Sequence, residues 1–83
     1  MKVNVRYFAS IREALGPMES VEMPAGASVA ALRQFLIGRS GAHAEALAPG
    51  KSLRAALNQT LCEESALLEE GAEVAFFPPV TGG

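Results

Sequence analysis

The sequence predicts an α+β domain in which a mixed β-sheet packs on one main helix, with short helices beside it. Residues 2–8 alternate in polarity, which is typical of a strand with one buried face, and residues 73–78 (EVAFFP) are predicted to form the last strand. Between them, residues 29–36 carry apolar side chains at helical spacing. The chain of 83 residues suffices for one small domain. A helix on one face of the sheet is the natural cover for so few strands.

The first strand is predicted over residues 2–8. Val3, Val5 and Tyr7 fall on one face of it. The opposite face is mostly polar, includes Arg6 and ends in Phe8. A short helix follows, because Ser10 and Glu13 have the spacing of a capping box.

Gly16-Pro17 is expected to end this short helix. Residues 18–23 alternate again, with Val21 and Met23 on one side, and Pro24 ends this second strand.

The main helix is predicted to start at the N-cap Ser28. Val29, Leu32 and Leu36 form an apolar stripe, which Phe35 is expected to widen. After candidate ends at Gly38 and Gly41, residues 42–48 are compatible with a further helical turn or two.

The second half of the chain contains two turn signals. Pro49-Gly50 is a turn dipeptide. Asn58-Gln59 is a possible turn within residues 53–61, with strand on one or both sides. Gly71 precedes the last strand. These patterns do not define the order of the strands in the sheet.

Two aromatic side chains are expected on the outer face of the sheet. If Val74 and Phe76 join the core with Tyr7, alternation places Phe77 outside, and the same argument places Phe8 there. Such an apolar patch is a partner surface, or it is covered by a loop or the tail, or both faces of the strand are partly buried. Alternation alone favours none of these.

The chain ends in a stiff apolar segment followed by two glycines. Proline cannot donate to a sheet, so the domain is predicted to span residues 1–77 and the tail residues 78–83. Six extended residues reach about 20 Å. Glycine passes narrow channels, and a terminal carboxylate becomes an acyl donor once it is activated, for example as an anhydride with AMP. The alternative is a frayed end.

Composition excludes several classes of function. A net charge of −2 and a pI of about 5.3 give no support to binding of nucleic acid or of an anionic membrane surface. The single Cys62 allows no intramolecular disulfide and no thiolate-based zinc or iron–sulfur site. Without a signal peptide or a long apolar run, a cytoplasmic protein is expected.

Three segments of the chain resemble one known family. VNVRYFASIREALG near the start, ALNQTL in the middle and GAEVAFFPPVTGG at the end resemble the small subunit of molybdopterin synthase, also called molybdopterin converting factor subunit 1. The resemblance spans nearly the whole chain, and the closing motif is the most specific part. It implies a ubiquitin-like β-grasp fold in which the sheet grips the main helix.

The resemblance also implies a function as a sulfur carrier without catalytic residues of its own. Gly83 would be adenylated with ATP by an adenylyltransferase similar to ubiquitin-activating (E1) enzymes and then converted to a thiocarboxylate. The large synthase subunit would receive the tail and transfer the sulfur to cyclic pyranopterin monophosphate, which forms the molybdopterin dithiolene. The domain itself would bind no cofactor or metal, and the assembly would be a 2:2 heterotetramer.

The residues of this chain that match the family's contact positions fall into two groups. The docking patch corresponds to Phe8, Leu61 and Phe77, with Arg12 beside them. The inserted tail consists of Pro78, Pro79, Val80, Thr81 and Gly82, ahead of the reactive Gly83.

Three further features have plainer interpretations. Cys62 is expected to be a small, half-buried apolar residue rather than a persulfide carrier. His43 is expected at the surface. The acidic stretch 63–73 is expected to be a solvated turn, or alternatively to steer the protein toward a basic partner groove.

Other functions use the same chain end. Gly83 could instead form isopeptide bonds, as in a ubiquitin-like modifier, or carry sulfur for thiamine synthesis or tRNA thiolation. A plain binding module would use Phe8 and Phe77 and would not need Gly82 and Gly83.

Overall fold

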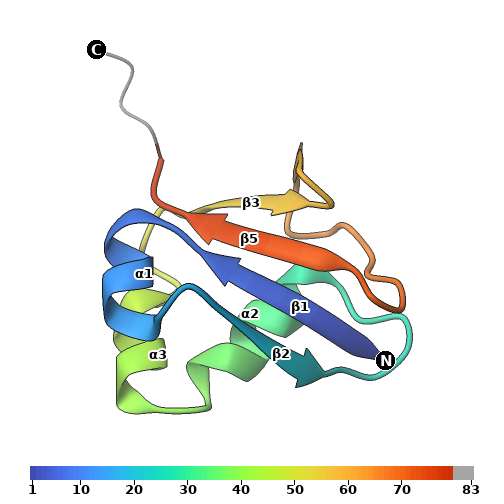
Figure 1. Cartoon of the computed structure of the whole chain (residues 1–83), viewed down its shortest axis with the longest axis horizontal. Coiled ribbons are helices and arrows are strands. Elements are labelled where there is room, and N and C mark those ends of the chain that lie inside the picture. Colours follow the sequence, from blue (N-terminus) through green and yellow to red (C-terminus); the bar gives the residue numbers. More distant parts are fainter. Residues whose placement is uncertain (80–83) are drawn as a thin grey trace.

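The computed structural model describes residues 1–79 as a five-stranded sheet and three helices (Figure 1). The elements, in chain order, are β1 (Lys2–Tyr7), α1 (Ala9–Leu15), β2 (Met18–Glu22), α2 (Val29–Ile37), α3 (Gly41–Ala46), β3 (Arg54–Leu57), β4 (Thr60–Cys62) and β5 (Glu73–Phe77). The predicted strands and the predicted main helix are all present.

The sheet is mixed, and its strands lie in the order β2-β1-β5-β3-β4. β1 and β5 pair in parallel, whereas β1–β2, β3–β4 and β3–β5 pair antiparallel. The first and last strands are therefore neighbours at the centre of the sheet. Figure 1 shows α2 crossing behind the strands, so helix covers one face of the sheet, as in a β-grasp domain.

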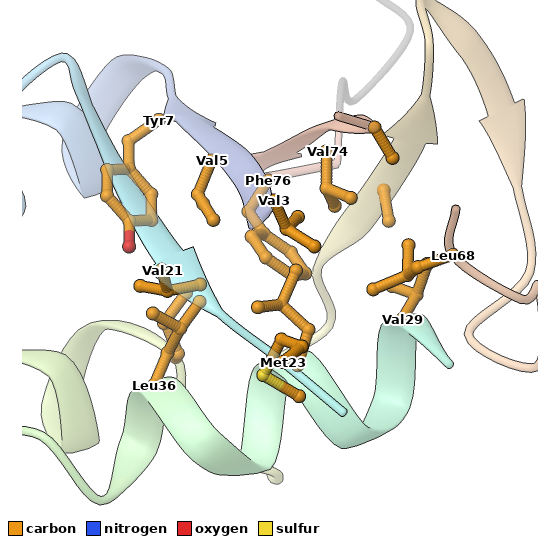
Figure 2. Packing of buried hydrophobic residues seen from close by; sticks show 14 of the residues in the cluster. Val3, Val5, Tyr7, Val21, Met23, Val29, Leu36, Leu68, Val74 and Phe76 are labelled. Atoms are coloured by element: carbon orange, nitrogen blue, oxygen red, sulfur yellow. The ribbon is translucent and has the colours of Figure 1, made fainter. Parts of the chain in front are cut away.

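The core lies between this face and α2 (Figure 2). Val29, Leu32 and Leu36 are completely buried, which confirms the predicted stripe. Opposite them lie the alternating apolar residues of the two central strands: Val3, Val5, Tyr7, Val74 and Phe76. Each such side chain contributes about 1.5–3 kcal/mol on burial.

Phe35 does not widen the stripe: its side chain is 43% exposed, and the Arg39 guanidinium lies 5.9 Å from its ring centre. At about 100° per residue, position 35 falls roughly 100° from the middle of the stripe, whereas position 33 falls only about 60° away. Arg33 therefore takes the buried place beside the stripe, with 5% exposure.

The Arg33 guanidinium is held by four acceptors. Its Nε donates to the Leu47 carbonyl at 2.9 Å, and its Nη2 donates to the carbonyls of Ala48 (2.6 Å) and Lys51 (3.0 Å). Its Nη1 pairs with Glu64 Oε2 at 2.6 Å. This clamp fixes the loop between α3 and β3, and it shows that part of the acidic stretch is paired rather than only solvated.

The predicted capping box at Ser10 is wrong. Ser10 lies inside α1, and the N-cap is Phe8, whose side chain makes no capping hydrogen bond. The chain enters the helix through a left-handed residue instead, since Ala9 has φ 53°. This turn starts the helix earlier than the sequence pattern indicates, while the end at Gly16 (φ 89°) is as predicted.

Of the two candidate ends of the main helix, Gly38 is the C-cap of α2 and Gly41 is not an end. Ser40 caps α3 by accepting a hydrogen bond from the His43 N–H, so Gly41 begins a helix rather than ending one. Asn58 and Gln59, with φ of 49° and 69°, form the tight turn between β3 and β4, and both flanking segments are strands. Two consecutive left-handed residues are the mark of a type I′ hairpin turn.

Candidate functional site

The face of the sheet opposite the helices carries a row of side chains that crosses all five strands. The strand register aligns Met18 on β2 with Arg6 on β1, Ala75 on β5, Ala56 on β3 and Leu61 on β4. Both alanines are buried because they are small and have larger neighbours, whereas Met18 (59%) and Leu61 (64%) are exposed. Apart from Arg6 this row is apolar, and exposed apolar side chains that line up on the outer side of a sheet are typical of partner binding.

Phe8 and Phe77 extend this row toward the point where the tail leaves the sheet. The Phe8 N–H donates to the Phe76 carbonyl at 3.3 Å, which places Phe8 beside the end of β5. Phe8 is 40% exposed and Phe77 is half-buried, with Arg54 as its cross-strand neighbour. We call Phe8, Met18, Ala56, Leu61, Ala75 and Phe77 the docking face.

The structure thus brings together the sequence-predicted contact residues Phe8, Leu61 and Phe77 on one face. Arg12 is exposed on α1, one turn after Phe8, where its N–H donates to the Phe8 carbonyl at 3.3 Å. Within residues 1–79 no loop covers Phe8 or Leu61, so the alternative of a patch hidden by a loop does not hold for these two side chains.

The tail begins directly at this face. β5 ends at Phe77, as the two prolines predict, and Pro78 is half-buried while Pro79 is exposed. The predicted tail residues Val80, Thr81, Gly82 and Gly83 lie outside the described residues.

Sequence reasoning missed Met18 and Arg6 as members of this surface. The Arg6 guanidinium lies 5.8 Å from the centre of the Phe8 ring and 4.0 Å from the Glu73 carboxylate. Its Nε atom is buried and has no hydrogen-bond partner among the described residues. The alternation of the strand did place Arg6 on the outer face, but only the register aligns it with Leu61 and Met18.

His43 does not lie free at the surface, contrary to the prediction. Its Nε2 contacts Glu19 Oε2 at 2.7 Å and its Nδ1 contacts Ser40 Oγ at 2.8 Å. The Tyr7 hydroxyl donates to the same Glu19 oxygen at 2.7 Å, and Arg39 Nε lies 3.4 Å from the other oxygen. This network joins β1, β2 and α3, so the histidine serves as a structural brace.

The network changes the acidity of two of its members. Burial raises the pKa of Tyr7, and its hydrogen bond to Glu19 raises it further. Burial alone would also raise the pKa of Glu19, but the hydrogen bonds from His43 and Tyr7 and the charges of His43 and Arg39 outweigh it and lower that pKa.

Cys62 is half-buried and packs against the core, as predicted. Burial, with the nearby Glu63 charge, raises the pKa of its thiol, which disfavours the thiolate needed for sulfur chemistry. Among residues 1–79 there is no group of three or more His, Cys, Asp or Glu side chains placed to hold a metal ion. Within the same range, the helices are too short or too polar to span a membrane.

Comparison with known proteins agrees with this geometry. The model of the ThiS family matches residues 5–83. The molybdopterin synthase sulfur carrier subunit of Escherichia coli is 48% identical over 82 residues, covering 98% of this chain and 99% of that protein. The protein of the same name from Haemophilus influenzae is 40% identical, with the same coverage.

Solved structures show the same fold. A molybdopterin converting factor subunit 1 from Pyrococcus furiosus, named as putative, superposes with a TM-score of 0.80 at 28% identity, covering 96% of this chain and 99% of that chain. The complex of subunits 1 and 2 of molybdopterin-converting factor from Helicobacter pylori contains a chain with a TM-score of 0.70 at 27% identity, with full coverage of both.

A small archaeal modifier protein 1 from Methanosarcina acetivorans also superposes, with a TM-score of 0.76 at 26% identity, covering 99% of this chain and 96% of that one. The ubiquitin-like β-grasp fold is therefore confirmed. The chain belongs to the ThiS family and, within it, groups with the molybdopterin synthase sulfur carrier subunits.

Proposed function

We propose that this protein is the sulfur carrier subunit of molybdopterin synthase. The observation that carries the proposal is the docking face: Phe8, Leu61 and Phe77 share one outer face of the sheet, and Phe8 and Phe77 lie where the chain leaves it. The protein is also 48% identical over nearly its full length to such a subunit. A partner that binds this face would also receive the segment that follows Phe77. The similarity to one chain of a two-subunit complex supports a large subunit as that partner.

The chemistry takes place at the carboxylate of Gly83. An adenylyltransferase of the E1 type attaches AMP from ATP to this carboxylate and releases pyrophosphate. A sulfur nucleophile then displaces AMP, which leaves a thiocarboxylate in place of the carboxylate. The large subunit accepts the tail and moves the sulfur to cyclic pyranopterin monophosphate, and two such transfers supply the two sulfurs of the dithiolene.

The domain's own part is to present this acyl group. It binds no cofactor itself, because ATP is consumed on the activating enzyme. Pro78 and Pro79 restrict the backbone after β5, so less conformational entropy is lost when the tail enters a partner. The reaction belongs to the cytoplasm, and the complex is a heterotetramer of two small and two large subunits.

Intact-mass analysis tests the proposal. The full-length protein is incubated with its activating enzyme, ATP and a sulfide source, and the product is then given to the large subunit with cyclic pyranopterin monophosphate. We expect the mass gain of one oxygen-to-sulfur exchange, followed by molybdopterin formation. Deletion of Gly83 should abolish both, whereas Cys62→Ser should retain both because the thiol takes no part. Normal molybdopterin synthesis by the deletion variant would refute the carrier role.

A ubiquitin-like modifier is the second candidate, and the similarity to a small archaeal modifier protein favours it. The same experiment separates the two functions. A modifier would give a protein-sized adduct on lysine side chains, without release of sulfur to a pterin. A carrier for thiamine synthesis or tRNA thiolation would gain sulfur but would form no molybdopterin with the large subunit.

A further inference from the structure

Three arginines surround the docking face. Arg6 projects from β1 and lies over the Phe8 ring, at 5.8 Å from its centre. Arg54 projects from β3 as the cross-strand neighbour of Phe77. Arg12 lies on α1, one turn beyond Phe8. We call Arg6, Arg12 and Arg54 the arginine rim.

The rim has almost no acidic partner within the domain. Among residues 1–79, no carboxylate lies within ion-pair distance of Arg12 or Arg54, and the contact of Arg6 with Glu73 is 4.0 Å long. By contrast, Arg33 and Arg39, which lie away from this face, are paired with Glu64 and Glu19. In a chain of net charge −2, the rim therefore leaves weakly paired positive charge beside the apolar docking face.

Each of the two strand arginines also borders a cleft. Arg54 lines a cleft of about 380 Å³ at the edge of the docking face, together with Leu53 and Leu61 and with the acidic Glu63 and Glu64. Arg6 lines a second one, of about 240 Å³, together with Met18 and Asn4 and with the acidic Glu19 and Glu73. The buried Nε of Arg6 has no partner there. Apart from the 4.0 Å contact between Arg6 and Glu73, these carboxylates form no ion pair with Arg6 or Arg54 among residues 1–79, so both guanidinium groups retain donors for an acceptor on a partner.

We propose that the large subunit binds the docking face through an acidic surface, with Asp or Glu side chains that pair with Arg6 and Arg54. This inference rests on the proposed function, and it adds the chemistry of the partner's surface and two residues that the family resemblance does not supply. Carboxylates are opposite in charge to the guanidinium group, and their two oxygens can accept its two parallel N–H donors. Burial of Phe8, Leu61 and Phe77 contributes most of the binding free energy. The arginine rim orients the two proteins and raises their association rate.

The test is a binding titration of the full-length protein with its large subunit from about 0.05 M to about 0.5 M NaCl. Arg6→Gln and Arg54→Gln should each raise Kd about two- to five-fold at the low-salt end. Both variants should also flatten the dependence of log Kd on log salt. Arg→Lys variants should keep most of the affinity, and Arg→Glu variants should bind more weakly than the glutamine variants.

Lys2→Gln is the matched control. Lys2 lies on the same face of β1 as Arg6, but four residues earlier, which is about 13 Å along the strand. Removal of its charge should leave Kd and the salt dependence unchanged. Circular dichroism spectra equal to that of the wild type verify that each variant is folded.

The outcomes separate the two proposals. If Arg6→Gln and Arg54→Gln both match the wild type at low salt, or if Lys2→Gln loses as much affinity as they do, the acidic surface is refuted while sulfur transfer by the wild type still stands. If the wild type itself does not bind the large subunit, both proposals fail.

Discussion

Replacement of Arg33 by methionine tests the clamp that holds the loop before β3. Methionine has a similar length and no donor, so the substitution removes all four hydrogen bonds with little change in volume. The Leu47 residue is completely buried, so its carbonyl is left without a partner, which costs about 1–3 kcal/mol. The carbonyls of Ala48 and Lys51 lie nearer the surface and can be hydrated.

The ion pair with Glu64 adds less than a buried pair would. The Glu64 side chain is 44% exposed, so its carboxylate regains water when the guanidinium is gone. We therefore expect a total loss of about 2–4 kcal/mol, compared with about 3–5 kcal/mol for breaking a fully buried pair. A domain of this size has roughly 4–12 kcal/mol in all, so the loss is easily measured.

Urea unfolding followed by far-UV circular dichroism measures this loss from the midpoint and slope of the transition. Glu64→Gln is the control and should cost less than about 1 kcal/mol, because only the half-exposed pair is lost. Arg33→Lys should be more stable than Arg33→Met but less stable than the wild type, since a single ammonium group cannot reach all four acceptors of the guanidinium group. An Arg33→Met protein within about 0.5 kcal/mol of the wild type would refute the clamp.

Four further outcomes are expected. Phe77→Ala should weaken binding of the large subunit about ten-fold or more, whereas Phe35→Ala, an exposed ring on the helix side, should not; equal effects would contradict the docking face. Folding lowers the pKa of Glu19, so its contribution to stability is present above its usual pKa and is lost as the pH falls through the lowered value. Glu19→Gln should therefore reduce the loss of unfolding free energy at acid pH, and an unchanged loss would count against the network. Folding raises the pKa of Tyr7 above 10.0, so its contribution to stability is present below that pH and is lost as the pH rises further. Tyr7→Phe should therefore lose less unfolding free energy at alkaline pH than the wild type, and a larger loss would contradict the argument. Gln59→Gly should stabilise the hairpin by about 0.5–1 kcal/mol, because glycine adopts φ 69° freely, and a lower unfolding midpoint would contradict the type I′ turn.

Local patterns in the sequence predicted the elements well, because the cause of each element is itself local. The stripe Val29, Leu32 and Leu36 and the turn at Asn58-Gln59 depend on residues only a few positions apart. Phe35 was misplaced because an apolar residue at the margin of a helical stripe competes with its neighbours, and here Arg33 found enough acceptors to be buried in its place.

The parts that could not be predicted depend on contacts between distant residues. His43 contacts Glu19, which lies 24 positions away in the sequence, and the residues next to His43 in the chain do not indicate that contact. The docking face is a similar case. Alternation assigned Phe8 and Phe77 to an outer face, but it could not align Met18 with Leu61, because that requires the strand order and four registers.

The position of β5 has a consequence for copies of the protein that are shortened at the C-terminus by proteolysis. This strand is bonded on both sides, to β1 and to β3, and it contributes Val74 and Phe76 to the core. A protease that trims the chain beyond Pro78 into this strand removes the middle of the sheet, so the remainder loses its globular structure altogether. Such fragments are therefore not expected to remain folded, and they cannot compete with the intact protein for binding to the partner.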